Sequence, residues 1–113
     1  LAVCFGTAHG IYAEAPELDI QRVRDIRAAM PASCRVVMHG GSGVDENQIR
    51  EAITAGVSKL NYYSYLGQAA TQNMVELLKG AYADKQWHDV QEAQVDFIKE
   101  YTKDVLRLFK NGK

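Results

Sequence analysis

The chain has 113 residues, 47% of them hydrophobic, and a formal net charge of −1 at pH 7, which suits one ordinary globular domain. Its charged residues form no basic cluster of the kind that nucleic-acid binding requires. No apolar run approaches the roughly 20 residues of a membrane-spanning helix, and no signal-peptide pattern is present. Composition therefore argues against nucleic-acid and membrane partners, and we expect a cytoplasmic protein.

The first predicted unit is a strand over residues 1–6 followed by a helix over about residues 19–30. The apolar residues of this helix recur at helical spacing and are Ile20, Val23, Ile26 and Met30. Asp19 is placed to cap the first N–H groups, and Pro31 ends the run.

The second predicted unit is a strand over residues 35–38 and a helix over residues 46–55. Asp45, with Gln48 three residues later, predicts a capping box. Gly56 suits the left-handed position that follows the end of a helix.

The third unit is a strand over residues 58–62 and a helix over about residues 64–82, loosened at Gly80. A long amphipathic helix is predicted in the remaining residues, 84–113. Its apolar positions are Val90, Ala93, Phe97, Ile98, Tyr101, Val105, Leu108 and Phe109. The two cysteines, Cys4 and Cys34, lie in strand-like apolar runs and are too few for a disulfide framework, so we predict buried, reduced thiols.

Short strands that are apolar on both faces are typical of parallel sheets covered by helices. Successive strand–helix units then leave two α/β folds, an open doubly wound sheet or a (β/α)8 TIM barrel. A barrel has eight strands and about 250 residues, so residues 1–83 would form only its last three βα units, with two open sheet edges. We therefore expect a piece of a longer protein that is not a stable monomer.

Two of the apolar runs end on a His–Gly pair, His9-Gly10 and His39-Gly40. A single histidine at a strand end is more often a core or loop residue. Two on neighbouring parallel strands meet at the same edge of the sheet, and imidazoles are frequent ligands of catalytic zinc. The pair therefore predicts one shared metal site, beside a glycine-rich turn that could also be merely a tight turn.

Three motifs follow one another in register along residues 1–79. They are Gly6-Thr7-Ala8-His9-Gly10-Ile11-Tyr12, His39-Gly40-Gly41-Ser42-Gly43 and Lys59-Leu60-Asn61-Tyr62-Tyr63-Ser64. In this order and spacing they resemble the C-terminal portion of the class II zinc-dependent ketose-bisphosphate aldolases, the family of the fructose-bisphosphate aldolases. The resemblance implies strands six to eight of a TIM barrel.

By the same resemblance, His9 and His39 are two of three histidine ligands to zinc. Family members take the third histidine, and the aspartate that acts as general acid/base, from an earlier barrel segment. This chain would thus hold no catalytic acid/base and be inactive alone. In the whole enzyme, zinc would act as a Lewis acid on the enediolate formed when a ketose 1,6-bisphosphate is cleaved to dihydroxyacetone phosphate and an aldehyde. A monovalent cation, sodium or potassium, is implied near Gly10 and Gly40.

For the sugar phosphate substrate, N–H groups of the glycine-rich turn and of the helix start after Tyr62 would hold the phosphate, and Asn61 would hydrogen-bond the enediolate. The expected substrate-binding residues are Gly10, Gly40, Gly41, Ser42, Asn61, Tyr62, Tyr63 and Ser64. Tyr62, Tyr63 and Tyr65 could instead be packing residues, and we interpret His88 and the C-terminal Lys and Arg residues as surface.

The motifs depart from the family pattern where the sugar is recognised. Tyr63 stands where fructose-bisphosphate members have an acidic residue and tagatose-bisphosphate members a small one. Ala13 and Glu14 replace a lysine common in the family. Residues 83–86 lack the usual Asp-Pro-Arg, although Lys85 could supply a charge. The resemblance therefore predicts the aldolase class but not the sugar.

A second hypothesis, from a different class, is a non-catalytic assembly or phosphate-binding module that pairs its open strand edges with another chain or with itself. Under both hypotheses the expected protein partners are the missing N-terminal barrel half and, because the last helix has a long apolar face, further copies in a homo-oligomer.

Overall fold

The computed structural model describes residues 1–111, which form an α/β chain with a parallel pair of strands. The elements in chain order are α1 (Ile20–Ala29), β1 (Val36–Met38), α2 (Glu46–Ala55), β2 (Val57–Leu60), α3 (Ser64–Lys79) and α4 (Trp87–Lys110). The parallel pairing expected from the short apolar strands is confirmed.

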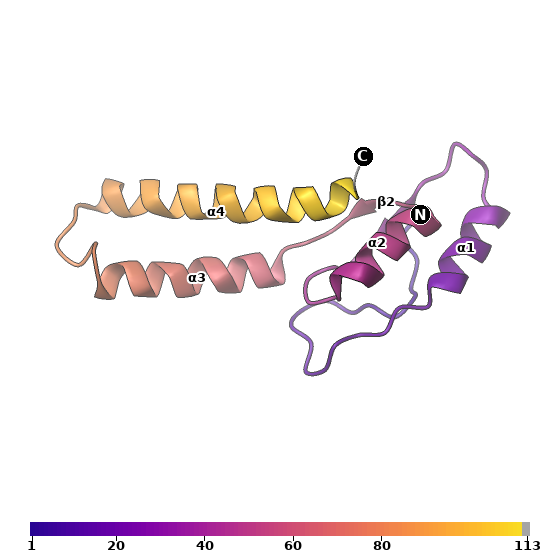
Figure 1. Ribbon diagram of the computed structural model, residues 1–113, viewed down its shortest axis with the longest axis horizontal. Helices are drawn as coiled ribbons and strands as arrows, with labels where there is room; N and C mark the ends of the chain where they lie inside the picture. The colour runs from indigo at the N-terminus through magenta and orange to yellow at the C-terminus, as the bar shows by residue number, and fades with distance from the viewer. Residues whose placement is uncertain (112–113) are drawn as a thin grey trace.

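The molecule has two regions (Figure 1). In the first, residues 1–63, α1 and α2 pack beside the strands, and we call it the sheet region. In the second, residues 64–110, α3 and α4 form an antiparallel pair that extends away from the sheet, and we call it the helical arm. The arm gives the molecule its elongated shape, 58 × 29 × 22 Å.

The hydrophobic core lies in the sheet region, on the side of the strands that α1 and α2 cover. Its buried members are Phe5, Val23, Val36, Met38, Val44, Ile49, Ala52 and Val57. Because side chains alternate along a strand, Val36 and Met38 enter this core, and Val37 and His39 lie on the opposite side. We call that opposite side the open face of the sheet.

The pairing of β1 with β2 contains one irregularity that decides which residues reach the open face. Val36 pairs with Val57, but Val37 pairs with Lys59 and Met38 with Leu60, so Ser58 is an extra residue in β2. An extra residue shifts the alternation of every later side chain. Lys59 and Asn61 therefore share the open face with His39.

The first predicted strand is wrong in extent. Residues 1–6 make a single parallel bridge, between Ala2 and Val37. Beyond it the carbonyl of Phe5 accepts a hydrogen bond from the N–H of Asp19 (2.8 Å). The segment thus leaves the sheet to contact the start of α1.

The predicted burial of the two cysteines is also wrong, although both thiols are free. Cys4 is exposed and Cys34 is half-buried. Phe5 takes the core side of its segment, so the alternation of side chains puts Cys4 on the open face.

Helix ends largely follow the predicted signals. Asp19 caps α1 by accepting from the N–H of Arg22 (2.9 Å), and Gly56 ends α2 with a φ of 125°. The third helix stops at Lys79, not at the predicted residue 82, because Gly80 ends it.

The predicted capping box at the start of α2 is only half made. The carboxylate of Asp45 accepts two N–H bonds of the first turn, at 2.9 and 3.2 Å. The side chain of Gln48 does not return the bond. It accepts from the N–H of Leu18 (2.7 Å) and donates to the carbonyl of Pro16 (3.1 Å), so it joins α2 to the loop before α1.

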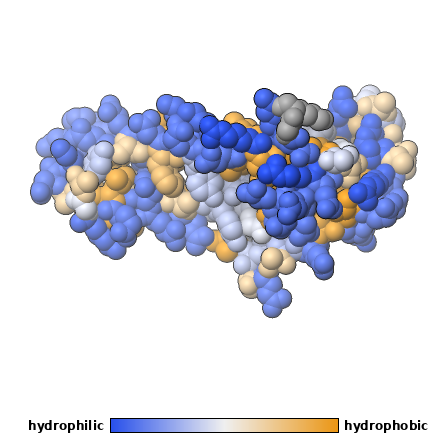
Figure 2. All heavy atoms as spheres, in the orientation of Figure 1, coloured by the Kyte–Doolittle hydropathy of each residue, from blue (hydrophilic) through white to orange (hydrophobic). Residues whose placement is uncertain are grey.

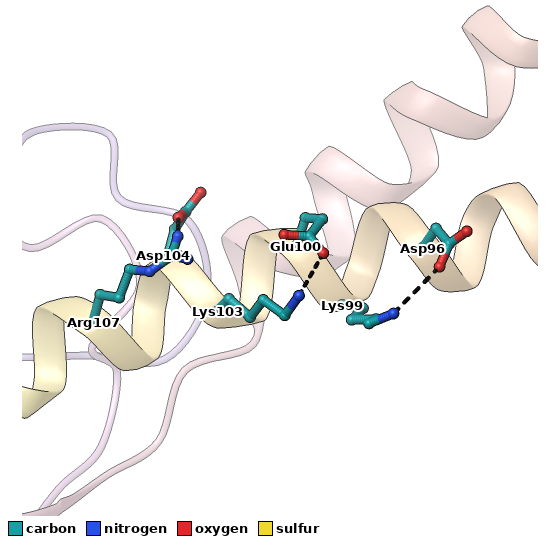
Figure 3. A network of polar contacts seen from close by, with 6 residues as sticks. All are labelled: Asp96, Lys99, Glu100, Lys103, Asp104 and Arg107. Carbon is teal, nitrogen blue, oxygen red and sulfur yellow. Dashed lines mark hydrogen bonds and ion pairs between the residues drawn. The ribbon is translucent and has the colours of Figure 1, made fainter.

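The polar face of α4 carries three consecutive i,i+3 ion pairs (Figure 3). They are Asp96–Lys99, Glu100–Lys103 and Asp104–Arg107, with N···O distances of 3.7, 2.6 and 2.6 Å. All six side chains are at least 45% exposed, which confirms the predicted solvated face. Within residues 1–111, no helix is both long and apolar enough to cross a membrane.

The surface of the helical arm is mixed rather than uniformly polar. In Figure 2 hydrophilic side chains dominate the arm, and hydrophobic ones gather mainly over the sheet region. Large exposed apolar side chains on the arm are Val75, Leu78, Trp87, Val95, Ile98 and Leu106. Homo-oligomerisation through this surface stays a prediction.

Candidate active site

The two strand-end histidines lie side by side. His9 belongs to the turn that follows the first chain segment, and His39 follows β1 directly. His9 Nε2 is 3.2 Å from His39 Nδ1, and the ring planes are nearly perpendicular, at 86°. Two imidazole nitrogens from residues 30 positions apart in the chain therefore face each other.

The spacing of these nitrogens fits one metal ion. Two nitrogens about 2.0–2.1 Å from a tetrahedral zinc are about 3.3 Å apart, close to the 3.2 Å between His9 and His39. Within residues 1–111 no further His, Cys, Asp or Glu completes a group of three with them. The described residues can supply two ligands of such a site.

Asn61 and Lys59 extend the pair into a four-residue cluster. Asn61 follows β2, and its Nδ2 lies 2.9 Å from His39 Nδ1. Lys59, two residues earlier on the same face, donates from Nζ to Oδ1 of Asn61. We call His9, His39, Lys59 and Asn61 the strand-end cluster.

Tyr12 joins the two turns that carry the histidines. Its hydroxyl accepts from the N–H of Ala8 (2.8 Å) and lies 2.7 Å from the carbonyl of Ala8 and 2.9 Å from that of Gly40. It can donate its single hydrogen to either carbonyl. Tyr12 belongs to the first sequence motif, but nothing in the spacing of that motif reveals a contact 28 residues away.

Gly40 allows the two histidine turns to touch. Its φ is 67°, and a Cβ added there would lie 2.1 Å from the carbonyl oxygen of Ala8. Gly10 also has a positive φ, 108°, but a Cβ there would meet nothing within 4 Å. The monovalent cation is expected near Gly10 and Gly40, and the carbonyl of Gly40 is in contact with the Tyr12 hydroxyl.

The predicted cradle of free N–H groups needs one correction. The N–H of Gly41 donates to the carbonyl of Asn61 (3.1 Å), so it is not free. The Ser42 hydroxyl, which is buried, accepts from the N–H of Tyr63 (3.1 Å). These two bonds tie the glycine-rich turn to the segment before α3.

The start of α3 keeps its N–H groups available. No side chain caps this helix, whose first residue is Ser64. The first turn of a helix presents unsatisfied N–H groups and a partial positive charge. Since the Ser42–Tyr63 bond brings the glycine-rich turn against this end, an anion could contact both.

The three tyrosines near this helix start divide into different roles. Tyr62 contacts α4: its ring packs on Phe109 and its hydroxyl is 3.3 Å from that of Tyr101. Burial and this hydrogen bond raise the pKa of Tyr62 far above its usual range. The expected substrate contact of Tyr62 is therefore not supported, and a packing role is. Tyr63 is 75% exposed, whereas the Tyr65 ring lies against Gly43.

Two candidate residues lie on the helical arm, away from the strand-end cluster. His88 is exposed beside Asp89 (3.5 Å), which agrees with the surface interpretation. Lys85 is exposed in the loop between α3 and α4, at the far end of the arm (Figure 1). It does not reach the histidines of its own chain.

A groove of about 540 Å³ separates α2 from α4. It is lined by Ile49, Tyr62, Tyr101 and Leu108, among others. Neither histidine lines it. The described residues therefore place the strand-end cluster on an open surface and not in an enclosed pocket.

Fold and site together define an α/β protein whose polar residues gather at the carboxyl ends of parallel strands. A sequence model of the family "Fructose-bisphosphate aldolase class-II" matches residues 1–113. The chain belongs to the class II fructose-bisphosphate aldolase family, as the three motifs predicted.

Individual relatives agree with this membership. The sulfofructosephosphate aldolase of Alkalicoccus urumqiensis is 35% identical over 106 residues, which cover 88% of this chain and 36% of that protein. The uncharacterised protein YdjI of Escherichia coli (strain K12) is 40% identical over 70 residues, or 62% of this chain and 24% of that protein.

Solved structures extend the agreement to the fold. The crystal structure of the YdjI aldolase from E. coli K12 superposes with a TM-score of 0.80 at 31% identity, covering 96% of this chain and 38% of that one. A candidate fructose-1,6-bisphosphate aldolase from Coccidioides immitis shares the fold, with a TM-score of 0.80 at 20% identity over 97% and 37% of the chains. The chain thus spans little more than a third of these proteins.

Proposed function

We propose that this chain forms the last three βα units of a (β/α)8 TIM barrel, with its C-terminal helix, in a class II aldolase. The whole enzyme would reversibly cleave a ketose 1,6-bisphosphate, or a close relative, into dihydroxyacetone phosphate and an aldehyde. The observation that carries the proposal is the 3.2 Å approach of His9 Nε2 to His39 Nδ1 at the strand ends. The family match supports the reaction class.

The open face of the sheet supports the barrel part of the proposal. His39, Lys59 and Asn61 are polar residues on a sheet face that α1 and α2 leave uncovered. In a TIM barrel that face is the interior, and residues at the carboxyl strand ends reach the active site. Strands that complete a barrel would enclose this face.

His9 and His39 would hold zinc through the two facing nitrogens, with a third ligand from an earlier barrel segment. When bound, zinc supplies Lewis-acid stabilisation of the negative charge that develops on the substrate oxygens. The chain's own residues bind and orient the substrate. The acid/base that moves the proton would come from outside this chain.

Asn61 would donate its amide hydrogens to the oxygen that becomes negative as the carbon–carbon bond breaks. Aimed donors at such a position stabilise the charge without reorganising. The uncapped start of α3, with the Gly40 and Ser42 N–H groups, would hold the substrate phosphate. The N–H of Gly41 would not contact the phosphate, because it already donates to the Asn61 carbonyl.

The substrate end far from this phosphate lacks an assigned partner. Tyr63 is exposed and is the residue directly before α3, and it offers a phenol hydroxyl in place of a cationic side chain. A relative at 35% identity is named a sulfofructosephosphate aldolase. Both a second phosphate and a sulfonate are therefore candidate anions at the far end.

The test uses the complete enzyme that carries this chain. Zinc content and release of dihydroxyacetone phosphate are measured with fructose 1,6-bisphosphate, tagatose 1,6-bisphosphate and sulfofructose phosphate, before and after chelation. His9→Ala and His39→Ala are each expected to lower zinc affinity at least about 100-fold and abolish turnover, while the control His88→Ala does neither. Turnover that survives complete zinc removal would refute the proposal.

The isolated chain gives a second test. Because it holds two of the proposed ligands and no acid/base, we expect no aldolase turnover from it, with or without added zinc. Turnover from the pure chain would show that the missing groups are not needed, and would overturn the division of roles.

A further inference from the structure

The resemblance to the aldolase family assigns no role to Lys59, yet this residue belongs to the strand-end cluster. The register irregularity at Ser58 turns it to the open face, opposite Val37. Without that extra residue the regular alternation would direct the lysine at the core. Lys59 is exposed on this face, and its ammonium donates to Oδ1 of Asn61.

The contact of Lys59 with Asn61 decides which way the amide of Asn61 points. An amide group has a hydrogen-bond acceptor on one side and a donor on the other, and its two ends have nearly the same shape. A lysine ammonium has three donors and no acceptor. It can therefore pair only with Oδ1, and the Nδ2 group must take the other side.

That other side faces the His39 nitrogen that is proposed to hold zinc. Nδ2 of Asn61 lies 2.9 Å from His39 Nδ1, the atom that faces His9. A ring nitrogen has one lone pair, so it can accept from Asn61 or bind a metal, but not both. A metal at this nitrogen would release the Asn61 amide hydrogens, which remain aimed at the same place.

We propose that Lys59 is a positioning residue of the aldolase site: its ammonium fixes the Asn61 amide so that the donor side, and never the carbonyl, faces the substrate oxygen that becomes negative. The inference rests on the proposed function. A flipped amide would place a carbonyl oxygen against that charge and oppose the reaction. Lys59 thus acts through Asn61 and touches neither the metal nor the substrate.

The central experiment substitutes Lys59 in the complete zinc enzyme. Lys59→Met keeps the length of the side chain and removes its donors. We expect kcat to fall about 10- to 100-fold, the KM for the ketose to change less than about threefold, and zinc content to stay at the wild-type level. Binding of a hydroxamate analogue of the enediolate is expected to weaken by a factor similar to the loss in kcat. Lys59→Arg, which retains donors, is expected to recover part of the loss, and Lys79→Met, a surface control on α3, to behave as wild type.

A double-mutant cycle separates positioning from a direct role. If Lys59 acts through Asn61, Lys59→Met in an Asn61→Ala background should change kcat less than about twofold. An equal loss in both backgrounds would mean that Lys59 acts independently of Asn61, and would overturn the inference. So would wild-type kcat and wild-type analogue affinity in Lys59→Met.

A readout without metal keeps this inference distinguishable from the proposed function. In the metal-free enzyme, the Asn61 side-chain N–H hydrogens should exchange with solvent faster in Lys59→Met and Lys59→Gln than in wild type, because the amide loses its single orientation. Should wild type release no dihydroxyacetone phosphate, the proposed function fails while this exchange measurement still tests the pair. Unchanged exchange in both variants would overturn the positioning role even if the enzyme is an aldolase.

Discussion

The sheet region and the helical arm are held in shape by opposite kinds of contact. In the sheet region the deciding contacts join residues about 30 positions apart, such as His9 with His39 and Leu18 with Gln48. In the arm, the three ion pairs along α4 join residues three positions apart and are exposed. Local contacts specify a helix but not a site, so chemistry collects where distant segments are forced together.

The largest loss of stability and of zinc affinity is expected where the turn of His39 touches the turn of His9. Gly40→Ala adds a Cβ 2.1 Å from the Ala8 carbonyl at a φ of 67°, so the histidine turns must separate. We expect a loss of about 3 kcal/mol or more in the free energy of unfolding and zinc binding at least about tenfold weaker, measured by denaturation and metal titration of the complete enzyme.

Gly10→Ala is the matched control for this substitution. It also places a side chain at a positive φ, 108°, which L-residues rarely adopt, but its Cβ meets nothing within 4 Å. We expect a loss of about 1–2 kcal/mol. Equal losses in the two variants would show that backbone conformation, and not the contact with Ala8, requires glycine at residue 40.

The next effect concerns the Tyr12 hydroxyl. Tyr12→Phe keeps the ring but leaves the Ala8 N–H and the Gly40 carbonyl without this partner. We expect a loss of about 1–2 kcal/mol and zinc binding about tenfold weaker, from calorimetric titration. Tyr65→Phe removes a hydroxyl that lies against Gly43 and not between the two histidine turns, so it should leave zinc affinity unchanged. A similar weakening there would remove the special role of Tyr12.

Tyr62 tests the junction between the two regions through pH. Its pKa is raised in the folded chain by burial and by the Tyr101 hydrogen bond. Above the usual tyrosine pKa of about 10, the unfolded chain loses this proton first, so stability is full below that pH and falls as pH rises.

Denaturation midpoints across that pH range should therefore decline in wild type and decline less in Tyr62→Phe. Tyr63→Phe, at a side chain that is 75% exposed, should follow the wild-type profile. Identical profiles for Tyr62→Phe and wild type would show that this phenol ionises no differently in the folded chain.

The smallest effects are expected in the arm. Lys103→Ala and Arg107→Ala each remove one exposed ion pair of α4 and should lower the melting temperature only slightly, by a difference that vanishes at about 0.5 M salt. Thermal melting of both variants at low and high salt measures this, with Lys85→Ala in the loop as control. A loss of folding stability as large as that of Gly40→Ala would break the contrast between the two regions.

Most of the secondary structure was predictable because its signals are local. The second helix was placed at residues 46–55, as observed, since Asp45 and Gly56 mark its ends. The first strand was overextended because its extent depends on a bond between Phe5 and Asp19 that no periodicity reveals. The capping box failed for the same reason, since Gln48 is drawn to the loop before α1.

The candidate site was predictable as a set of residue types but not as a geometry. The two His–Gly pairs at strand ends were enough to predict that His9 and His39 meet, and their nitrogens do. The hydrogen bond of the Gly41 N–H and the direction of the Tyr62 ring could not be predicted, because both depend on partners in other elements.

By itself the sequence determined the order of strands and helices, the parallel pairing and the family, because hydrophobic period, caps and motif spacing are properties of short segments. Only the tertiary structure decided which side chains share the open face, that Tyr12 bridges the two turns, and that Lys59 pairs with Asn61. The Tyr12 bridge depends on a contact 28 residues away, which no local pattern encodes. For the open face and the Lys59–Asn61 pair, the physical reason is the single extra residue at Ser58: it reverses the alternation of the side chains after it, and whether it is accommodated depends on the neighbouring strand.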